Sequence, residues 1–420
     1  MMRDHLPNQL LVISSYPPKG NTHHSSIVGV ASYTKNTVVA LQKYATNPIE
    51  ITVLAEKLVG TDTKDTDEGI LVKRLWQRNS FATFWVLFKE IAKNYKATTH
   101  ILIEFEVAMF GGMSSLLPFP LFLLALKLMN KQTTIVFHQV INDLDDLHGH
   151  INLPEHSYQA KILTPSIHLF YRLILLLASQ AIVFDDALRT SLSRFSNKKI
   201  SVIPHGVETF SDLPTQEAAK KSLLIDNDAC VLLYFGFIAW YKGTDLLVEA
   251  FQKIPESIRK EKKLQLIIAG GPNPNHVGKA YYDEYLRKIS AACDTAAITV
   301  TGFVPEEHIA RYYQTADLVL FPYRTYMSAS GPLSLCFSFH KPFLLSQTLK
   351  PTLRNADIRS VLQEVGRNEE GLVFSMKDDD FLSKITDPKR IQRLQKVSEK
   401  VADLRSWKAI GKQYYERLFI

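Results

Sequence analysis

Four loops carry the side chains and glycines most able to do chemistry, and each follows an apolar run. The first comes after residues 233–235 and holds Gly236, Lys242 and Gly243, with a helical pattern starting near Thr244. A glycine lets the backbone approach a ligand closely, and a lysine adds a full charge to the free N–H groups at the start of a helix. This combination favours a bound diphosphate. The alternative is an ordinary strand-to-helix turn with a surface lysine.

The other three loops are weaker signals when taken alone. The turn at Gly270 and Gly271 permits close approach of a nucleobase or ribose, but a structural turn explains it equally well. Residues 328–331 form a small-residue loop before a helical pattern, so their amides and hydroxyls favour an anion, with a capping loop as the alternative. His205 follows the apolar residues 202–203 and, by itself, is better explained as a structural histidine.

Buried strands must position these loops. In the first half of the chain, short apolar runs predict strands at residues 9–14, 51–55, 70–74, 100–104, 134–138, 181–184 and 200–203. Helical spacing lies between them, as in residues 30–41. Strands that alternate with helices predict βαβ units and a parallel sheet, in which ligands bind beyond the carboxyl ends of the strands.

The second half repeats this pattern after a polar segment at residues 204–222, which predicts a hinge. Strands are expected at residues 230–235, 264–269, 298–301, 318–321 and 343–345. Two charged runs, residues 63–69 and 259–263, predict solvated loops or helix ends.

Composition and length favour two globular domains with an anionic ligand. The chain has 420 residues, of which 46% are hydrophobic and 22% charged, and a formal net charge of +7. This length suits two α/β domains of roughly 200 residues. The positive balance suits an anionic ligand or an anionic membrane surface. Because the basic residues are scattered and no recognition motif is present, nucleic acid is not an expected partner.

Cysteines and apolar stretches bear on the compartment. The three cysteines have no zinc-site spacing and predict reduced core residues of a cytoplasmic protein. The apolar residues 116–129 are too short to span a bilayer, and residues 162–184 carry His168 and Arg172 near their middle. Both stretches predict buried helices. The alternative is an interfacial face that makes a peripheral contact with the inner side of the membrane.

In this order and spacing, the motifs resemble the retaining group 1 glycosyltransferases of family four, which have the GT-B fold. The resemblance rests on residues 202–207, 236–251, 301–305 and 312–323 in the second half. In the first half it rests on residues 15–18 and 29–33, and on Glu106 with residues 110–112. The last helical pattern, residues 407–418, is similar to the closing helix of that family.

The resemblance implies an α/β chain of two Rossmann-like parallel-sheet domains with a cleft between them. Residues 1–203 would form the acceptor-side domain and residues 204–395 the nucleotide-sugar-binding domain. Residues 396–420 would form a helix that crosses back to the first domain.

It also implies a hexosyltransferase that moves a sugar, with retention, from a nucleotide-diphosphate sugar to a hydroxyl of a glycan or lipid-linked acceptor in polysaccharide biosynthesis. No metal and no cofactor besides the donor is expected. The catalytic residues would be His138 and Lys242, and Glu106 and His205 would contact the acceptor or sugar. Asp185 follows the apolar residues 181–184, where its carboxylate could orient an acceptor hydroxyl, with a helix N-cap as an equally good alternative. The donor would be bound by Gly29, Gly236, Lys242, Gly271, Arg324, Ser330, Gly331 and Pro332.

Departures from the family pattern keep other functions open. Met327 and Leu335 occupy the positions of two family glutamates, and Phe237 and Ala239 stand where an arginine is often found. One alternative is therefore a catalytically degraded glycosyltransferase-like binding protein. Another is a different enzyme of this fold, such as a sugar-phosphate phosphorylase or an epimerase.

Overall fold

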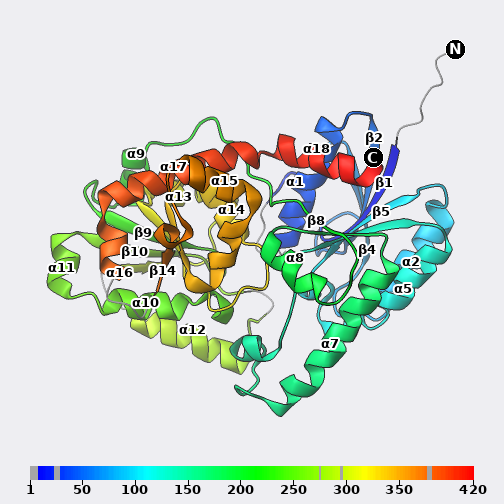
Figure 1. Ribbon diagram of the computed structural model, residues 1–420, viewed down its shortest axis with the longest axis horizontal. Coiled ribbons are helices and arrows are strands. Elements are labelled where there is room, and N and C mark those ends of the chain that lie inside the picture. Colours follow the sequence, from blue (N-terminus) through cyan, green and yellow to red (C-terminus); the bar gives the residue numbers. More distant parts are fainter. Residues whose placement is uncertain (1–7, 23–28, 274–275, 294–296, 376–380) are drawn as a thin grey trace.

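Two α/β lobes lie side by side in the computed structural model, which describes residues 8–22, 29–273, 276–293, 297–375 and 381–420 (Figure 1). Each lobe is built on one β-sheet covered by helices. The two Rossmann-like sheets expected from the alternation of strands and helices are thus confirmed.

The first sheet contains eight strands in the order β3-β4-β2-β1-β5-β6-β7-β8. The neighbouring strands run parallel, except that β3 is antiparallel to β4. The predicted strands are present as β1 (Asn8–Ile13), β2 (Ile49–Glu56), β4 (Ile70–Trp76), β5 (His100–Phe105), β6 (Gln132–Phe137), β7 (Gln180–Val183) and β8 (Ile200–Val202). Their apolar runs are buried because helices cover both faces of the sheet.

The prediction of a solvated loop at residues 63–69 was wrong. β3 (Lys64–Asp67) forms a hairpin with β4, and the turn between them uses positive φ angles at Glu68 and Gly69. Asp67 is buried because Lys35 lies 2.8 Å from its carboxylate. The charged strand is stable here because the buried ammonium of Lys35 compensates the charge of the Asp67 carboxylate.

Helices cover the two faces of the first sheet. The chain crosses from β1 to β2 through α1 (Gly29–Tyr44), whereas the later crossovers advance in the opposite direction and so place their helices on the other face. There α2 (Thr83–Asn94), α5 (Phe119–Leu128) and α7 (Tyr158–Leu177) pack next to one another. The remaining elements are α3 (Val107–Phe110), α4 (Met113–Leu116), η1 (Asp145–Leu147), α6 (His148–Ile151) and α8 (Asp186–Ser193).

The second sheet contains six parallel strands in the order β11-β10-β9-β12-β13-β14. The strands are β9 (Cys230–Phe235), β10 (Leu264–Ala269), β11 (Ile298–Val300), β12 (Leu318–Phe321), β13 (Phe343–Ser346) and β14 (Val373–Phe374). The sequence did not predict β14, because two residues are too few to show a period.

Helices of the second domain lie between these strands and after them. The α-helices are α9 (Gln216–Ser222), α10 (Thr244–Gln252), α11 (Glu256–Glu261), α12 (Ala280–Ala292), α13 (Glu306–Thr315), α14 (Gly331–Ser338), α15 (Ala356–Glu364), α16 (Phe381–Thr386) and α17 (Pro388–Leu404). The short 3₁₀ helices are η2 (Trp240–Lys242), η3 (Gln347–Arg354) and η4 (Glu369–Leu372).

The chain crosses between the domains twice. The first hydrophobic core ends at Ile203 and the second begins at Val207. The second core ends on α17, and α18 (Trp407–Phe419) then returns to pack on α1 (Figure 1). Where these helices meet, the hydroxyls of Tyr33 and Tyr414 lie 2.6 Å apart.

Candidate active site

A cleft of about 300 Å³ lies between the two domains, at the carboxyl ends of their strands. Glu106 follows β5, His138 follows β6 and Gly236 follows β9, and all three line the cleft. This is the edge where parallel α/β sheets bind ligands, and the volume is within the range of small-molecule sites.

Most of the residues predicted for the site line this cleft. They are Gly29, Glu106, His138, His205, Gly236, Lys242, Gly271, Ser330, Gly331 and Pro332. Arg324 and Asp185 do not line it. Residues from both domains therefore converge on one space, although most of them are far apart in the sequence.

Lys242 is a buried cation in the wall of the cleft. It ends η2, and its Nζ atom lies 5.8 Å from the ring centre of Tyr323 and 6.0 Å from that of Tyr241. Burial lowers the pKa of the lysine to about 8, and the Glu106 carboxylate opposes this effect. Within the described residues the ammonium has no ion-pair partner. A buried charge without a partner is unfavourable, so this site favours an anion.

The N-terminus of α10 does not reach the cleft, which corrects part of the prediction for this loop. The helix begins at Thr244 and is capped by Gly243, and neither of the two lines the cleft. Gly243 has a φ of 67°, and a Cβ atom there would lie 2.1 Å from the carbonyl oxygen of Pro322. The glycine thus allows a close turn of the backbone, and Lys242 is the part of the turn that faces the ligand space.

The N-terminus of α14 does open on the cleft. Ser330 caps this helix by accepting a hydrogen bond from the Leu333 amide, and its hydroxyl lies 2.9 Å from that of Tyr323. A Cβ atom built on Gly236 would lie 3.0 Å from Pro332 and 3.1 Å from the Lys242 ammonium. The lysine and the start of α14 therefore flank the same glycine, where a helix N-terminus adds to the attraction for an anion.

The double-glycine turn brings loops of the second sheet together. A Cβ atom on Gly270 would lie 1.9 Å from the carbonyl oxygen of Gly236, and one on Gly271 would lie 2.8 Å from the Phe303 amide. Both glycines also line the cleft. The two glycines can thus serve both as a structural turn and as a site of close approach for a nucleobase or ribose.

His138 is paired with a buried acid that the sequence analysis did not select. The Nε2 atom of His138 lies 2.7 Å from a carboxylate oxygen of Glu104, which is fully buried in β5. Burial raises the pKa of Glu104, and the hydrogen bond to His138 opposes that effect. The sequence feature that could have revealed this acid is a single glutamate within the apolar residues 101–105, two positions before Glu106.

Glu106 provides the acidic side of the cleft. Burial raises the pKa of its carboxyl, while His138, Arg78 and Lys242 act in the opposite direction. Glu106, from the first domain, thus lines the same cleft as the two candidate catalytic residues, His138 and Lys242.

The region around His205 is aromatic. Its ring lies 4.8 Å from that of Tyr33, and its Nδ1 atom lies 2.9 Å from the carbonyl oxygen of Gly206. Trp407, from α18, also lines the cleft and fits closely on Gly206, where a Cβ atom would lie 2.5 Å from the indole ring. The sequence analysis assigned Trp407 to a closing helix but not to the site.

The structure places Arg324 and Asp185 in contacts between protein groups. Arg324 forms an ion pair with Asp245 and stacks on Trp240, with 5.0 Å between the guanidinium carbon and the ring centre. Asp185 caps α8 by accepting the Leu188 amide at 2.8 Å, and it also accepts the hydroxyl of Tyr326. Neither side chain lines the cleft, and the N-cap alternative for Asp185 is the one that the structure shows.

A backbone contact between the domains positions the loop before α14. The amide of Val140 donates to the carbonyl of Met327 at 2.8 Å, and Gln139 pairs with Ser328 as an isolated antiparallel bridge. The segment that leads to Ser330 is therefore held by the first domain, next to His138.

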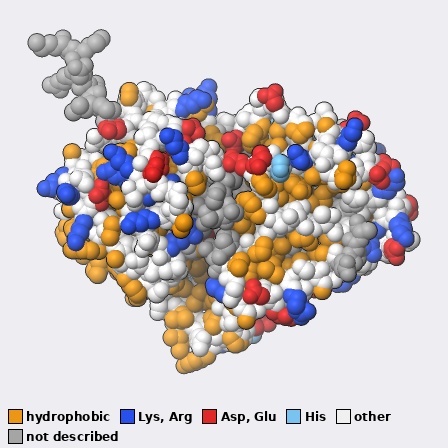
Figure 2. Space-filling model, turned by 180° about the vertical axis from the view of Figure 1, so that it is seen from behind, with side chains coloured by type: hydrophobic (Ala, Val, Ile, Leu, Met, Phe, Trp, Pro, Cys, Tyr) orange, Lys and Arg blue, Asp and Glu red, His pale blue; other side chains and the backbone are white. Residues whose placement is uncertain are grey.

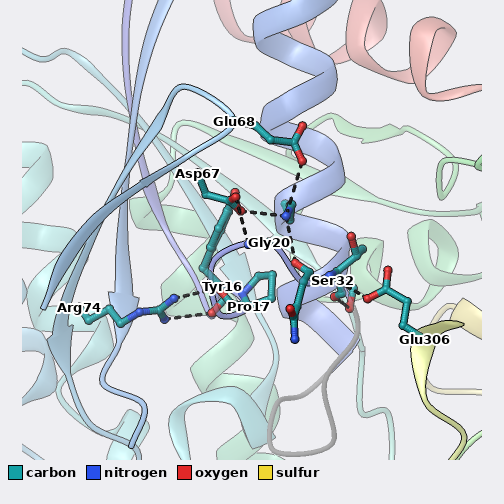
Figure 3. Close-up of polar contacts among 11 residues, drawn as sticks. Tyr16, Pro17, Gly20, Ser32, Asp67, Glu68, Arg74 and Glu306 are labelled. Carbon is teal, nitrogen blue, oxygen red and sulfur yellow. Dashed lines mark hydrogen bonds and ion pairs between the residues drawn. The ribbon is translucent and has the colours of Figure 1, made fainter. Parts of the chain in front are cut away.

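A second set of contacts fixes the loop after β1 (Figure 3). Arg74 donates to the carbonyls of Tyr16 at 3.0 Å and Pro17 at 2.7 Å, and the amide of Gly20 donates to Asp67 at 3.2 Å.

The same loop also contacts the second domain. The amide of Thr22 donates to Glu306 of α13 at 3.0 Å. The next residues, 23–28, lie outside the described part, and Gly29 then starts α1 at the cleft.

The described residues contain no group of three or more histidine, cysteine or acidic side chains that could hold a metal ion. To an anion, the described part of the cleft offers the ammonium of Lys242 and the N-terminus of α14 at Ser330.

Comparison with known proteins relates part of the chain to a family. Residues 215–336 match the family model "Glycosyl transferases group 1". A lipopolysaccharide 1,2-N-acetylglucosaminetransferase of Salmonella typhimurium is 25% identical over 226 residues, which are 52% of this chain and 56% of that protein. The match thus spans about half the length of the curated relative.

Solved structures match over nearly the whole chain. Sucrose-phosphate synthase of Thermosynechococcus elongatus has a TM-score of 0.73 at 19% identity and covers 98% of this chain and 99% of its own. HepE of Anabaena in complex with UDP-glucose has a TM-score of 0.63 at 14% identity, with coverage of 98% and 99%. The chain therefore has the GT-B fold, and its residues 215–336 match the family of group 1 glycosyl transferases.

Proposed function

We propose that the chain transfers a hexose from a nucleotide-diphosphate sugar to a hydroxyl group of a glycan or lipid-linked acceptor. The observation that carries this proposal is the buried ammonium of Lys242, which has no ion-pair partner among the described residues and lies beside the N-terminus of α14. A diphosphate is an anion that both groups can bind. Charge-assisted hydrogen bonds of this kind contribute about 1.5–3 kcal/mol each.

The second domain would hold the donor and the first domain would complete the site. With the diphosphate against Lys242 and Ser330, the transferred sugar would lie toward His138 and Glu106, which face the same space. The acceptor hydroxyl would attack C1 of the sugar as the bond from C1 to the diphosphate oxygen breaks, and that diphosphate would take the proton. Catalysis then rests on placement and on stabilisation of the leaving diphosphate by protein groups in place of a metal.

The comparisons support the substrate classes. HepE was solved with UDP-glucose, and the Salmonella relative is named for transfer to lipopolysaccharide. These facts concern those proteins, and for this chain they favour a nucleotide sugar and an envelope glycan. Retention of configuration follows from the resemblance to family four.

One alternative is a binding protein that holds a nucleotide sugar without transferring it. The observation that favours it is that Leu335 lines the cleft and Met327 contacts the first domain through its carbonyl, where the family pattern has glutamates. Donor binding without turnover is the result that would distinguish this protein from a transferase.

The first test is a thermal-shift screen with UDP, GDP, ADP and dTDP sugars. A donor at about 100 times its dissociation constant stabilises the folded protein by about 2.7 kcal/mol. We expect one donor class to raise the melting temperature, Lys242→Ala to weaken this effect, and Lys253→Ala on the exposed side of the same domain to leave it unchanged.

Product analysis with acceptor glycans then separates transfer from binding. If no donor stabilises the protein, or if Lys253→Ala weakens binding as much as Lys242→Ala, the donor site is not the one proposed.

A further inference from the structure

The first domain has an apolar surface that no part of the described chain covers. It lies on α2, α5 and α7, which pack side by side. These helices, with Leu117 just before α5, hold more than half of the exposed large apolar side chains among the described residues. In Figure 2 orange side chains gather along the lower left margin and the lower tip, where the reversed view places α5 and α7.

Two stripes of exposed side chains form this surface, which we name the α5–α7 face. On α5 the stripe is Leu117, Leu121, Leu124 and Leu128, which are 41–76% exposed. On α7 the stripe is Tyr158, Ile162, Leu169, Leu173 and Leu176, which are 38–77% exposed. The spacing of three and four residues puts each stripe on one side of its helix.

The opposite sides of both helices are part of the core. Phe119 of α5 and Phe170 of α7 are buried and lie 6.4 Å apart between ring centres. Each helix is thus apolar on its inner and its outer side. A core accounts for the inner side alone, and contiguous exposed apolar surfaces mark interaction sites.

The charged side chains on α5 and α7 have a single sign. Neither α5 nor α7 contains an aspartate or a glutamate, whereas Lys127, Lys161 and Arg172 are exposed. Lys127 donates to the carbonyl of Leu176 at 3.4 Å and so joins the ends of the two helices. A partner that covers this face should therefore be apolar in its interior and negatively charged at its surface.

α7 meets the length and apolarity of a membrane span among the described helices, but a third of its most apolar window is buried in the fold. Its inner side is also tied to the first domain by hydrogen bonds. The Tyr171 hydroxyl accepts the Ile141 amide at 3.1 Å, and His168 bonds to the carbonyl of Asn142 at 2.7 Å. The helix can therefore lie along a membrane surface while the domain stays folded.

We propose that the α5–α7 face docks on an anionic phospholipid bilayer. The leucine stripes enter the boundary between headgroups and acyl chains, and Lys127, Lys161 and Arg172 bind lipid phosphates, since long basic side chains can extend toward the headgroups. Trp85 of α2, with Lys89 4.9 Å from its ring, extends the surface with a pair suited to this depth. A twofold contact with a second copy is less favourable because it brings like charges together.

The test is co-sedimentation of the full chain with vesicles, and it does not depend on the transfer reaction. Vesicles of phosphatidylglycerol mixed with phosphatidylcholine are compared with phosphatidylcholine alone. We expect binding to the anionic vesicles that weakens as salt is added. Leu121→Gln with Leu169→Gln, and separately Lys127→Glu with Arg172→Glu, should each raise the lipid concentration for half-binding about tenfold or more.

Control changes of the same kind lie on the loop after β2, where Lys57→Glu with Val59→Gln alters exposed residues far from these helices in sequence. The control protein should bind vesicles as the unchanged protein does, and all variants should keep the unchanged melting temperature. The proposal is overturned if the unchanged protein does not bind anionic vesicles, if it binds neutral vesicles equally well, or if the control weakens binding as much.

Light scattering distinguishes docking on a second copy of the chain from docking on a membrane. Self-association that the Leu121→Gln and Leu169→Gln pair abolishes, without vesicle binding, would assign the face to a dimer and overturn the proposal. Because the donor screen with Lys242→Ala probes the other domain, failure of either proposal can be recognised separately.

Discussion

The imidazole Nε2 of His138 lies 2.7 Å from a carboxylate oxygen of Glu104, on the neighbouring strand of the first sheet. The second oxygen of Glu104 is buried and has no hydrogen-bond partner among the described residues. His138 is therefore the group that compensates this buried acid. In return, the acid fixes the orientation of the ring at the wall of the cleft.

We predict that Glu104→Gln lowers kcat while leaving donor binding intact. Glutamine keeps the size of the side chain, but it cannot stabilise a positively charged imidazole. The expected loss is about 10–100-fold, by analogy with groups that orient metal-binding histidines. The measurements are kcat and the thermal shift given by the donor. The pH profile of kcat should also change.

Glu50→Gln, which changes an exposed side chain at the start of β2, is the matched control for that substitution. It should leave kcat unchanged. An unchanged kcat in Glu104→Gln would show that the pair has only a structural role.

Donor binding should weaken as the pH rises above about 8. Burial lowers the pKa of Lys242 to about 8, so the free protein loses this positive charge at a pH where other lysines keep theirs. The charged form binds a diphosphate, so the dissociation constant should rise with pH through this range. In Lys242→Ala the same titration, followed by calorimetry between pH 7 and about 9, should be nearly flat. Equal pH dependence in both proteins would contradict the assignment.

Much of the fold was predictable because parallel strands are buried on both faces and so appear as apolar runs. The strands β9, β10 and β12 begin and end where the sequence analysis placed them. The hairpin strand β3 was missed because its charges are neutralised by Lys35 and by neighbouring residues that the local sequence does not reveal. Tertiary contact, not propensity, decides such a strand.

The site was predictable where a motif lies at the end of a strand. Lys242, Ser330 and Gly236 line the cleft for that reason. Arg324 was assigned to the donor by position alone, and its partner Asp245 could not be anticipated without the fold. Trp407 lines the cleft because α18 crosses back to pack on α1 of the first domain, a contact across nearly the whole sequence.

The pH dependence of stability should depend in part on Asp185. Burial raises the pKa of its carboxyl from 3.8 to about 6, against the effect of the Leu188 amide. Because the pKa in the folded protein is above its unfolded value, the contribution to stability is fully present below pH 4 and is lost as the pH rises through about 6. Asp185→Asn removes the charge and can still cap α8, so we expect it to raise the melting temperature at pH 8 but not at pH 4.

Asp185→Ala provides the comparison for the cap. It removes the acceptor for the Leu188 amide and for Tyr326, so it should destabilise the protein by about 1–2 kcal/mol at either pH. If Asp185→Asn shows the pH dependence of the unchanged protein, the carboxyl does not titrate in this range.

Gly243 and Gly366 offer a matched test of space at the site, because their φ angles are 67° and 64°. A Cβ atom on Gly366 would meet nothing within 4 Å, whereas one on Gly243 would lie 2.1 Å from the carbonyl oxygen of Pro322. Alanine at either position adopts an unfavourable left-handed conformation, which costs about 1–2 kcal/mol. Gly243→Ala should lose about 1–3 kcal/mol more, because the turn must move away from Pro322.

The same movement shifts Lys242, the neighbouring residue. Donor stabilisation in the thermal-shift screen should therefore fall in Gly243→Ala and persist in Gly366→Ala. Equal melting temperatures and equal donor responses in the two variants would mean that the turn relaxes freely, and that its geometry does not hold the lysine in place.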